Sequence, residues 1–292
     1  MVHVLRPEST ADALRALDEG GEDTKVIAGG TAVVLMMRNG LVFPEQLVAL
    51  DRLPGLDRIE IGPDEVRIGA LATLRAVERS TELQAALPTL TAAVGLVANH
   101  RIRQRATVGG VVCESDYASD PPAVLVTLGA EVEIVSSRGA RRVPLAEFLV
   151  GYYETVLQPG ELVTGIRLPR PSPGVRTTYI KFISRSAEDR PCVGIAAHVD
   201  IDDAGRCTDM RVAVAGATAT PFQVPAATEA VRGAKAADPS TWDAVAGAYR
   251  DAISPIGDVR GSAGYRKHVT GELVRRALAT VGSGAANGAY RL

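Results

Sequence analysis

The 292-residue sequence predicts an α+β fold with two lobes before a linker and one domain after it. Residues 1–55 alternate short apolar β-like runs with helix-like runs, which is typical of a small βαβαβ unit. Residues 56–170 mix hairpin-like alternation with helical stretches and form the predicted second lobe. The run "PRPSPGVR", which overlaps the end of that lobe, holds three prolines and is the predicted linker. A C-terminal domain is expected at 175–283, followed by a tail at 284–292.

The first lobe is predicted from its start and stop signals. Ser9 or Thr10 can cap a helix whose leucines share one face, and Gly20-Gly21 can end it. A second helix-like run follows the segment "KVIAGG". We expect strands at 2–7, 25–30 and 46–51 and the first helix at 8–21.

The second lobe and the C-terminal domain are predicted in the same way. The run 59–70 alternates across a Gly-Pro-Asp turn, and Pro88 should interrupt the helical stretch 74–98 to leave one or two helices. The C-terminal domain should carry three antiparallel strands and two helices, and its Gly/Ala-rich tail looks disordered. We expect a Gly-Gly turn, a short helix and a hairpin in 106–145, strands at 161–169, 178–185, 192–202 and 209–217, and helices at 244–253 and 263–280.

Composition excludes several classes of protein. With 46% hydrophobic residues the chain is globular, and a net charge of −2 with scattered basic residues gives no footprint for nucleic acid. No membrane span or signal peptide is predicted, so we expect a cytoplasmic protein. The cysteines and histidines are too widely spaced for a metal or iron–sulfur site, so no metal ligand is predicted. These residues are Cys113, Cys192, Cys207, His3, His100, His198 and His268.

The stretch "IAGGTAVVLMM" combines a strand, two glycines and a helix-like run. Glycine permits unusual backbone dihedrals and close approach, and the start of a helix supplies free N–H groups, so the stretch can bind phosphate. It matches neither the Rossmann nor the P-loop motif, and a purely structural turn is the alternative. The two methionines in it, Met36 and Met37, are expected to fill the core.

A second glycine pair lies in "RATVGGVVCESD". Two such turns on separate lobes can hold one extended diphosphate between them, with a later carboxylate available to ribose hydroxyls. The arginines before this turn are expected to be solvated or to bridge the lobes. The residues alone therefore leave a dinucleotide site and two structural turns as alternatives.

Five motifs in order resemble one family. They are "VIAGGTAVVLMMRNG", "RIRQRATVGGVVCESDYASDPPAVL", "GELVTGIRLP", "YIKFISRSAEDRPCVGIAAHV" and "DVRGSAGYRKHVTGELVRRAL". In order and spacing they resemble the FAD-binding medium subunit of molybdenum hydroxylases, the carbon monoxide dehydrogenase and xanthine dehydrogenase group. The resemblance implies a two-lobed FAD-binding domain of the vanillyl-alcohol oxidase or PCMH type. It also implies a C-terminal domain of a three-stranded antiparallel sheet plus helices.

The resemblance also implies which residues hold FAD. Lys181 would lie near the flavin ring, where a cation can stabilise negative charge on the reduced ring, although the residues alone predict a partly exposed strand lysine. Val111 stands where the family usually has asparagine, which removes an amide that can form hydrogen bonds. The implied FAD-binding residues are Ala28, Gly29, Gly30, Thr31, Ala32, Val33, Thr107, Val108, Gly109, Gly110, Val111, Asp120, Val163 and Lys181.

By the same resemblance, the chain passes electrons from iron–sulfur clusters on a partner subunit through FAD to an external acceptor. Molybdopterin would lie on a large subunit and [2Fe–2S] clusters on a small one, in a dimer of heterotrimers. No side chain of this chain is then expected to be catalytic. Two alternatives stay open: a stand-alone flavoenzyme of the same fold that acts on a small molecule, and an assembly or binding protein that has lost FAD.

Overall fold

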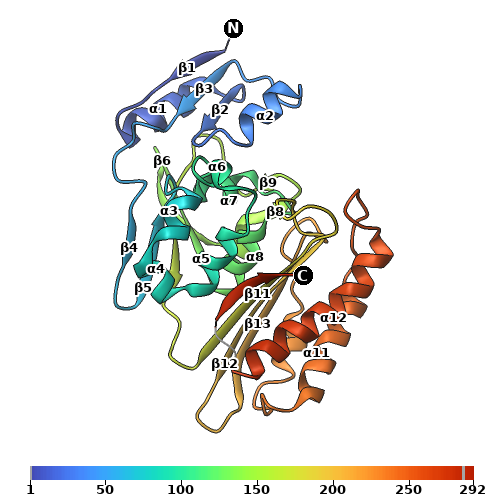
Figure 1. Cartoon of the computed structure of the whole chain (residues 1–292). Helices are drawn as coiled ribbons and strands as arrows, with labels where there is room; N and C mark the ends of the chain where they lie inside the picture. Colours follow the sequence, from blue (N-terminus) through green and yellow to red (C-terminus); the bar gives the residue numbers. More distant parts are fainter. Residues whose placement is uncertain (1, 285–286) are drawn as a thin grey trace.

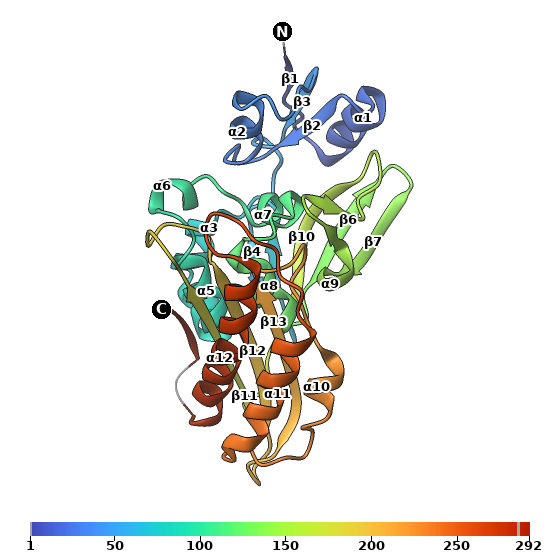
Figure 2. The same cartoon turned by 90° about the vertical axis from the view of Figure 1, so that its right-hand side faces the viewer.

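The three parts of the chain follow one another along the long axis of the molecule (Figure 1). The structure is a computed structural model that describes residues 2–284 and 287–292. The first lobe lies at one end, the second lobe in the middle and the C-terminal domain at the other end (Figure 2). No helix in the described residues combines the length and the hydropathy that a membrane span requires.

The first lobe is the predicted βαβαβ unit. Its parallel sheet has the order β1-β3-β2. Ser9 caps the first helix, because its side chain accepts a hydrogen bond from the N–H of Asp12. The second helix begins at Val33, separated from the first glycine pair by two residues, and buries no residue completely. The elements are β1 (His3–Leu5), α1 (Thr10–Gly20), β2 (Thr24–Ile27), α2 (Val33–Arg38) and β3 (Gln46–Ala49).

The second lobe is built on a five-stranded sheet of order β4-β5-β10-β6-β7. The strand predicted at 161–169 lies at its centre and pairs antiparallel with both neighbours. A small hairpin, β8 with β9, follows the sheet's outer hairpin. The strands are β4 (Ile59–Ile61), β5 (Glu65–Gly69), β6 (Glu131–Ser136), β7 (Gly139–Pro144), β8 (Leu149–Gly151), β9 (Glu154–Thr155) and β10 (Leu162–Pro169).

The helical stretch 74–98 contains three helices, so the prediction of one or two was wrong. Ser80 ends the first and caps the second, since its side chain accepts from the N–H of Leu83, and Pro88 begins the third. The helices of this lobe are α3 (Leu74–Arg79), α4 (Thr81–Ala86), α5 (Pro88–Gly95), α6 (His100–Arg103), α7 (Val108–Glu114), α8 (Asp120–Thr127) and α9 (Leu145–Phe148).

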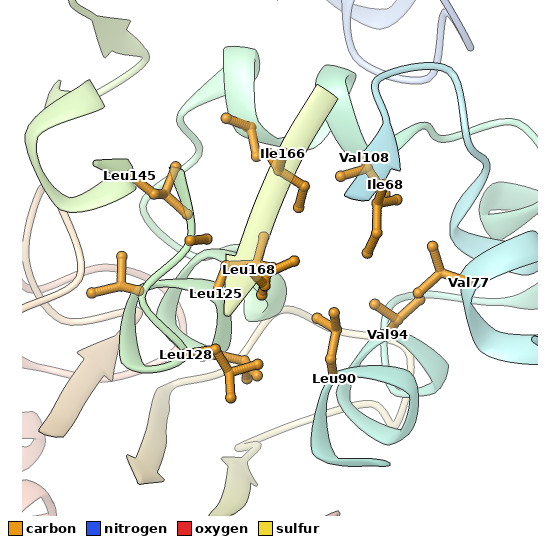
Figure 3. Close-up of a cluster of buried hydrophobic side chains, with 14 of the residues drawn as sticks. Ile68, Val77, Leu90, Val94, Val108, Leu125, Leu128, Leu145, Ile166 and Leu168 are labelled. Carbon is orange, nitrogen blue, oxygen red and sulfur yellow. The ribbon is translucent and has the colours of Figure 1, made fainter. Parts of the chain in front are cut away.

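The largest core lies between the helices and the sheet of the second lobe (Figure 3). Ile68 and Ile166 come from neighbouring strands, and Leu90, Val108 and Leu125 come from three helices that pack on them. All five side chains are buried. Burying apolar surface of this extent is the main stabilising term of the lobe and fixes the helices that line the site described below.

The C-terminal domain contains the three predicted antiparallel strands, in one sheet with order β13-β12-β11-β14. Helices α11 and α12 cover one face of this sheet (Figures 1 and 2). The other face packs on the second lobe, because Tyr179, Ala196 and Ala213 belong to that lobe's core. The elements are β11 (Val175–Phe182), β12 (Val193–Ile201), β13 (Cys207–Ala215), α10 (Pro225–Glu229), α11 (Pro239–Ala252), α12 (Ala263–Gly282) and β14 (Gly288–Arg291).

The tail was predicted to be disordered, and for residues 288–291 that prediction was wrong. These residues form β14, which pairs parallel with β11 and completes a four-stranded sheet. The edge of β11 offers unpaired backbone groups, and the tail satisfies them. Tyr290 also packs against the core of the domain. Residues 285 and 286 of the predicted tail lie outside the described residues.

Candidate functional site

A cavity of about 260 Å³ lies where the first lobe meets the second. Both predicted glycine segments border it, although more than 70 residues separate them in the sequence. The structure therefore brings together most of the residues that the sequence analysis assigned to one site. The predicted residues that line the cavity are Ala28, Gly29, Gly30, Thr31, Ala32, Val33, Thr107, Gly109, Gly110, Val111 and Val163.

The first glycine turn links β2 to α2 and requires both of its glycines. Gly30 has φ of 73°, a left-handed conformation that side chains with a Cβ adopt at a cost. A Cβ on Gly29 would lie 2.6 Å from the carbonyl carbon of Arg105, and closer still to its oxygen. Gly29 therefore lets the first lobe touch the second at the cavity.

The same turn presents unused hydrogen-bond donors to the cavity. In the described chain, the backbone N–H groups of Gly29, Gly30, Thr31 and Ala32 donate to no protein acceptor. Successive N–H groups of this kind, placed just before a helix, are typical of anion-binding turns. The turn is therefore suited to hold the oxygens of a phosphate or diphosphate.

The second glycine pair contributes space and no donors. Gly109 and Gly110 lie inside the first turn of α7, and not in a turn before a helix as predicted. Their N–H groups are already used, because Gly109 donates to Ala70 and Gly110 to the side chain of the cap residue Thr107. A Cβ on Gly109 would lie 2.7 Å from that of Ala70, so this glycine allows α7 to approach β5 closely.

Apolar side chains that the sequence analysis did not assign form the remaining walls. Met36 lines the cavity, so the prediction that it fills the core was wrong; it lies on the inner side of α2. Leu157 comes from the segment before β10, and Leu162 is the first residue of that strand. The further apolar lining residues are Val26, Leu50, Ala70, Leu71 and Ala106.

Three polar or ionisable side chains at the cavity have defined states. Burial, with the charge of Asp116 as a smaller cause, raises the pKa of Glu114 to about 7. Glu161 is ion-paired to Arg141 at 2.7 Å, and the hydrogen bond from Arg141 lowers the pKa of Glu161. Burial raises the pKa of the Cys113 thiol to about 12, so this cysteine is a protonated thiol at neutral pH.

Asp120 and Lys181 lie outside the cavity lining and bind each other. Lys181 Nζ is 2.7 Å from Asp120 Oδ2 and also donates to the carbonyl of Leu96 at 2.9 Å. Tyr179 donates to the other carboxylate oxygen at 2.6 Å. The residue-based prediction that Lys181 is partly exposed was wrong, because β11 carries Lys181 on the face of the C-terminal sheet that packs on the second lobe, and this packing buries it completely. Val108, the remaining predicted residue, packs in the core of the second lobe.

The cavity has the features that a flavin dinucleotide requires. Free N–H groups at the first turn suit a diphosphate, and the apolar walls suit flat aromatic rings. The glycines have no side chain that would keep a bound ligand away from the backbone of the two glycine segments. In the residues that the structure describes, no group of three or more His, Cys, Asp or Glu side chains is placed to hold a metal ion.

Comparison with known proteins identifies relatives over nearly the whole chain. Residues 1–171 match a family model described as the FAD binding domain in molybdopterin dehydrogenase, and residues 178–281 match the CO dehydrogenase flavoprotein C-terminal domain. The chain is 33% identical to the 6-hydroxypseudooxynicotine dehydrogenase complex subunit alpha of Paenarthrobacter nicotinovorans, over 93% of this chain and 91% of that protein. It is 35% identical to the carbon monoxide dehydrogenase medium chain of Afipia carboxidovorans, over 94% of each. The structure of a carbon monoxide dehydrogenase from Hydrogenophaga pseudoflava superimposes with a TM-score of 0.93 at 30% identity, over 98% of each chain.

Proposed function

The chain belongs to the family of FAD-binding subunits of molybdopterin dehydrogenases, and on this premise we propose that it is the electron-transfer subunit of such an oxidoreductase. The observation that carries the proposal is the cavity between the lobes, with its four unused N–H groups. When bound, FAD supplies the chemistry of accepting and passing on electrons. The protein's own task is to bind, orient and enclose the cofactor.

Each wall of the cavity has a separate task in this proposal. The turn at 28–33 holds the diphosphate through backbone N–H groups and lets the two lobes touch. Residues 107–111 let the cofactor approach α7 closely. This chain has Val111 where the family usually has asparagine, so the side-chain amide is missing. No backbone donor is lost, because the N–H of Val111 already donates to the carbonyl of Thr107. Val163 and its apolar neighbours exclude water from the ring.

The roles of Asp120 and Lys181 are part of the proposal. Their buried pair joins β11 to the start of α8, the helix that follows α7 in the chain. We propose that the pair positions α7 against the cofactor. Direct contact of either side chain with the flavin would require the cofactor to reach past the walls of the cavity.

The partners are proposed from the names of the relatives. Those proteins are a "complex subunit alpha" and "medium" chains or subunits, so we propose that this chain also works in a complex, with a large molybdopterin subunit and a small [2Fe–2S] subunit. A dimer of heterotrimers that donates to an external acceptor is the proposed assembly. A cytoplasmic location is proposed with it, and it agrees with the three cysteines being free thiols.

Flavin content tests the proposal. The chain would be purified without and then with added FAD, its visible spectrum recorded, and the flavin released on denaturation identified. We expect a flavin spectrum and release of FAD. A colourless protein that gains no thermal stability from excess FAD, both alone and in the assembled complex, would contradict the proposal. If the wild-type chain takes up no flavin, Val111→Asn is the matched variant. Flavin uptake by this variant would show that the valine at position 111 caused the loss of FAD binding.

A further inference from the structure

Helix α2 and the segment that follows it form an exposed apolar face. The inner side of the helix lines the cavity through Val33 and Met36, while Val34 and Leu35 on its outer side are 42% and 56% exposed. Farther along the segment, Leu41 is 70% and Phe43 is 80% exposed. We call these four outward side chains, Val34, Leu35, Leu41 and Phe43, the α2 face. Large apolar side chains that are this exposed and lie within one short segment of the chain are typical of a protein interaction site.

Three exposed arginines without an ion-pair partner lie on α2 or in the neighbouring segment of the second lobe. Arg38 ends α2, and Arg101 and Arg105 lie in and after α6, which is on the end of the second lobe that faces the first lobe (Figures 1 and 2). The backbone of Arg105 also contacts the turn before α2. All three arginines are exposed, and in the described ranges none has a carboxylate within 4.0 Å. An apolar centre with a cationic rim suits a partner that presents an apolar centre and a carboxylate rim.

We propose that the α2 face docks a partner subunit of the enzyme complex, one with an apolar surface edged by Asp and Glu, and that this subunit is the one that exchanges electrons with the cofactor. The inference rests on the proposed function. A second copy of this chain is a poor occupant, because a symmetric contact would bring the arginine rims of two copies together.

The position of α2 supports the electron-exchange role. Helix α2 contributes Val33 and Met36 to the cavity and Val34 and Leu35 to the α2 face, so one helix separates this part of the face from the cavity. A helix with its side chains is about 10 Å thick. A subunit docked on the α2 face therefore comes within about one helix diameter of the cavity. The docked surface would also keep water from the cavity wall that α2 forms.

The test uses the complete complex, made by expressing the chain with the large and small subunits of its own enzyme. The variant carries Leu35→Ser and Phe43→Ser. The control carries Val150→Ser and Val259→Ser, two valines outside the α2 face that are 50% and 83% exposed. We expect the variant chain alone to keep its FAD content and melting temperature while its affinity for the other subunits falls about tenfold or more. The control should assemble like the wild type.

A charge-reversal arm tests the rim. Arg101→Glu with Arg105→Glu should weaken assembly and reduce its salt dependence, whereas Arg142→Glu, at an exposed arginine on β7, should do neither. Unchanged assembly of the serine variant would overturn the proposal. The proposal would also be overturned if the wild-type chain alone is a dimer and the serine variant alone is a monomer, since a second copy would then occupy the face. A wild-type chain that binds no FAD would instead count against the proposed function, because flavin content is measured separately from assembly.

Discussion

Substituting Gly29 by alanine tests whether contact between the lobes shapes the cofactor site. The added Cβ would lie 2.6 Å from the carbonyl carbon of Arg105, whereas ordinary van der Waals contact is 3.4–4 Å. The carbonyl oxygen of Arg105 is closer still and belongs to the backbone, so the two segments have to separate by more than about 1 Å, and the turn moves with them. A shift of that size misaligns the N–H groups that face the cavity. A charge-assisted hydrogen bond contributes about 1.5–3 kcal/mol, so losing one raises the Kd for FAD about 10–100-fold.

The assay is titration of the flavin-free chain with FAD, with urea unfolding measured in parallel. Gly30→Ala and Gly40→Ala are the matched controls, because their φ values of 73° and 67° impose similar strain of about 1–2 kcal/mol without a backbone clash. Gly40→Ala should destabilise the fold and leave FAD affinity unchanged, and Gly30→Ala should weaken both moderately. A Gly29→Ala protein that is folded and binds FAD within threefold of the wild type would show that contact between the lobes does not shape the cofactor site.

Two further predictions concern the buried charges. The pKa of Glu114 is raised from 4.5 to about 7, so between these pH values the folded state holds a proton that the unfolded state has lost. The free energy of unfolding therefore falls as the pH rises through this window, by at most about 3 kcal/mol. Glu114→Gln should therefore reduce the difference in unfolding free energy between pH 5 and pH 8, and an unchanged difference in urea titrations would disprove the assignment. Lys181→Met leaves Asp120 buried without its cation and should cost about 3–5 kcal/mol, with partial recovery when Asp120→Asn is added. Equal stability of the single and double variants in the same assay would show that the pair is not coupled.

Local signals were sufficient for most elements of the fold. The first lobe, the hairpin at 59–70 and the three strands of the C-terminal domain could be predicted because apolar periodicity, glycine and proline act over a few residues. The split of 74–98 into three helices was missed, although Ser80 is a cap residue and its signal was present. The tail strand was missed because its partner, the edge of β11, lies more than 100 residues away in the sequence.

The candidate site, like the fold, has some features that local sequence signals predict and others that depend on distant segments. The residues alone were enough to identify two glycine segments, to show that the first suits a phosphate, and to find five ordered motifs that resemble one family of flavoproteins. The packing of the lobes was needed to show that both segments line one cavity, that the second offers space and not donors, and that Met36 and Leu157 complete the wall. The packing of the C-terminal sheet was needed to show that Lys181 is buried against Asp120. The reason is physical: propensity and capping depend on neighbours in the chain, whereas burial and the use of each N–H group depend on which distant segments pack together.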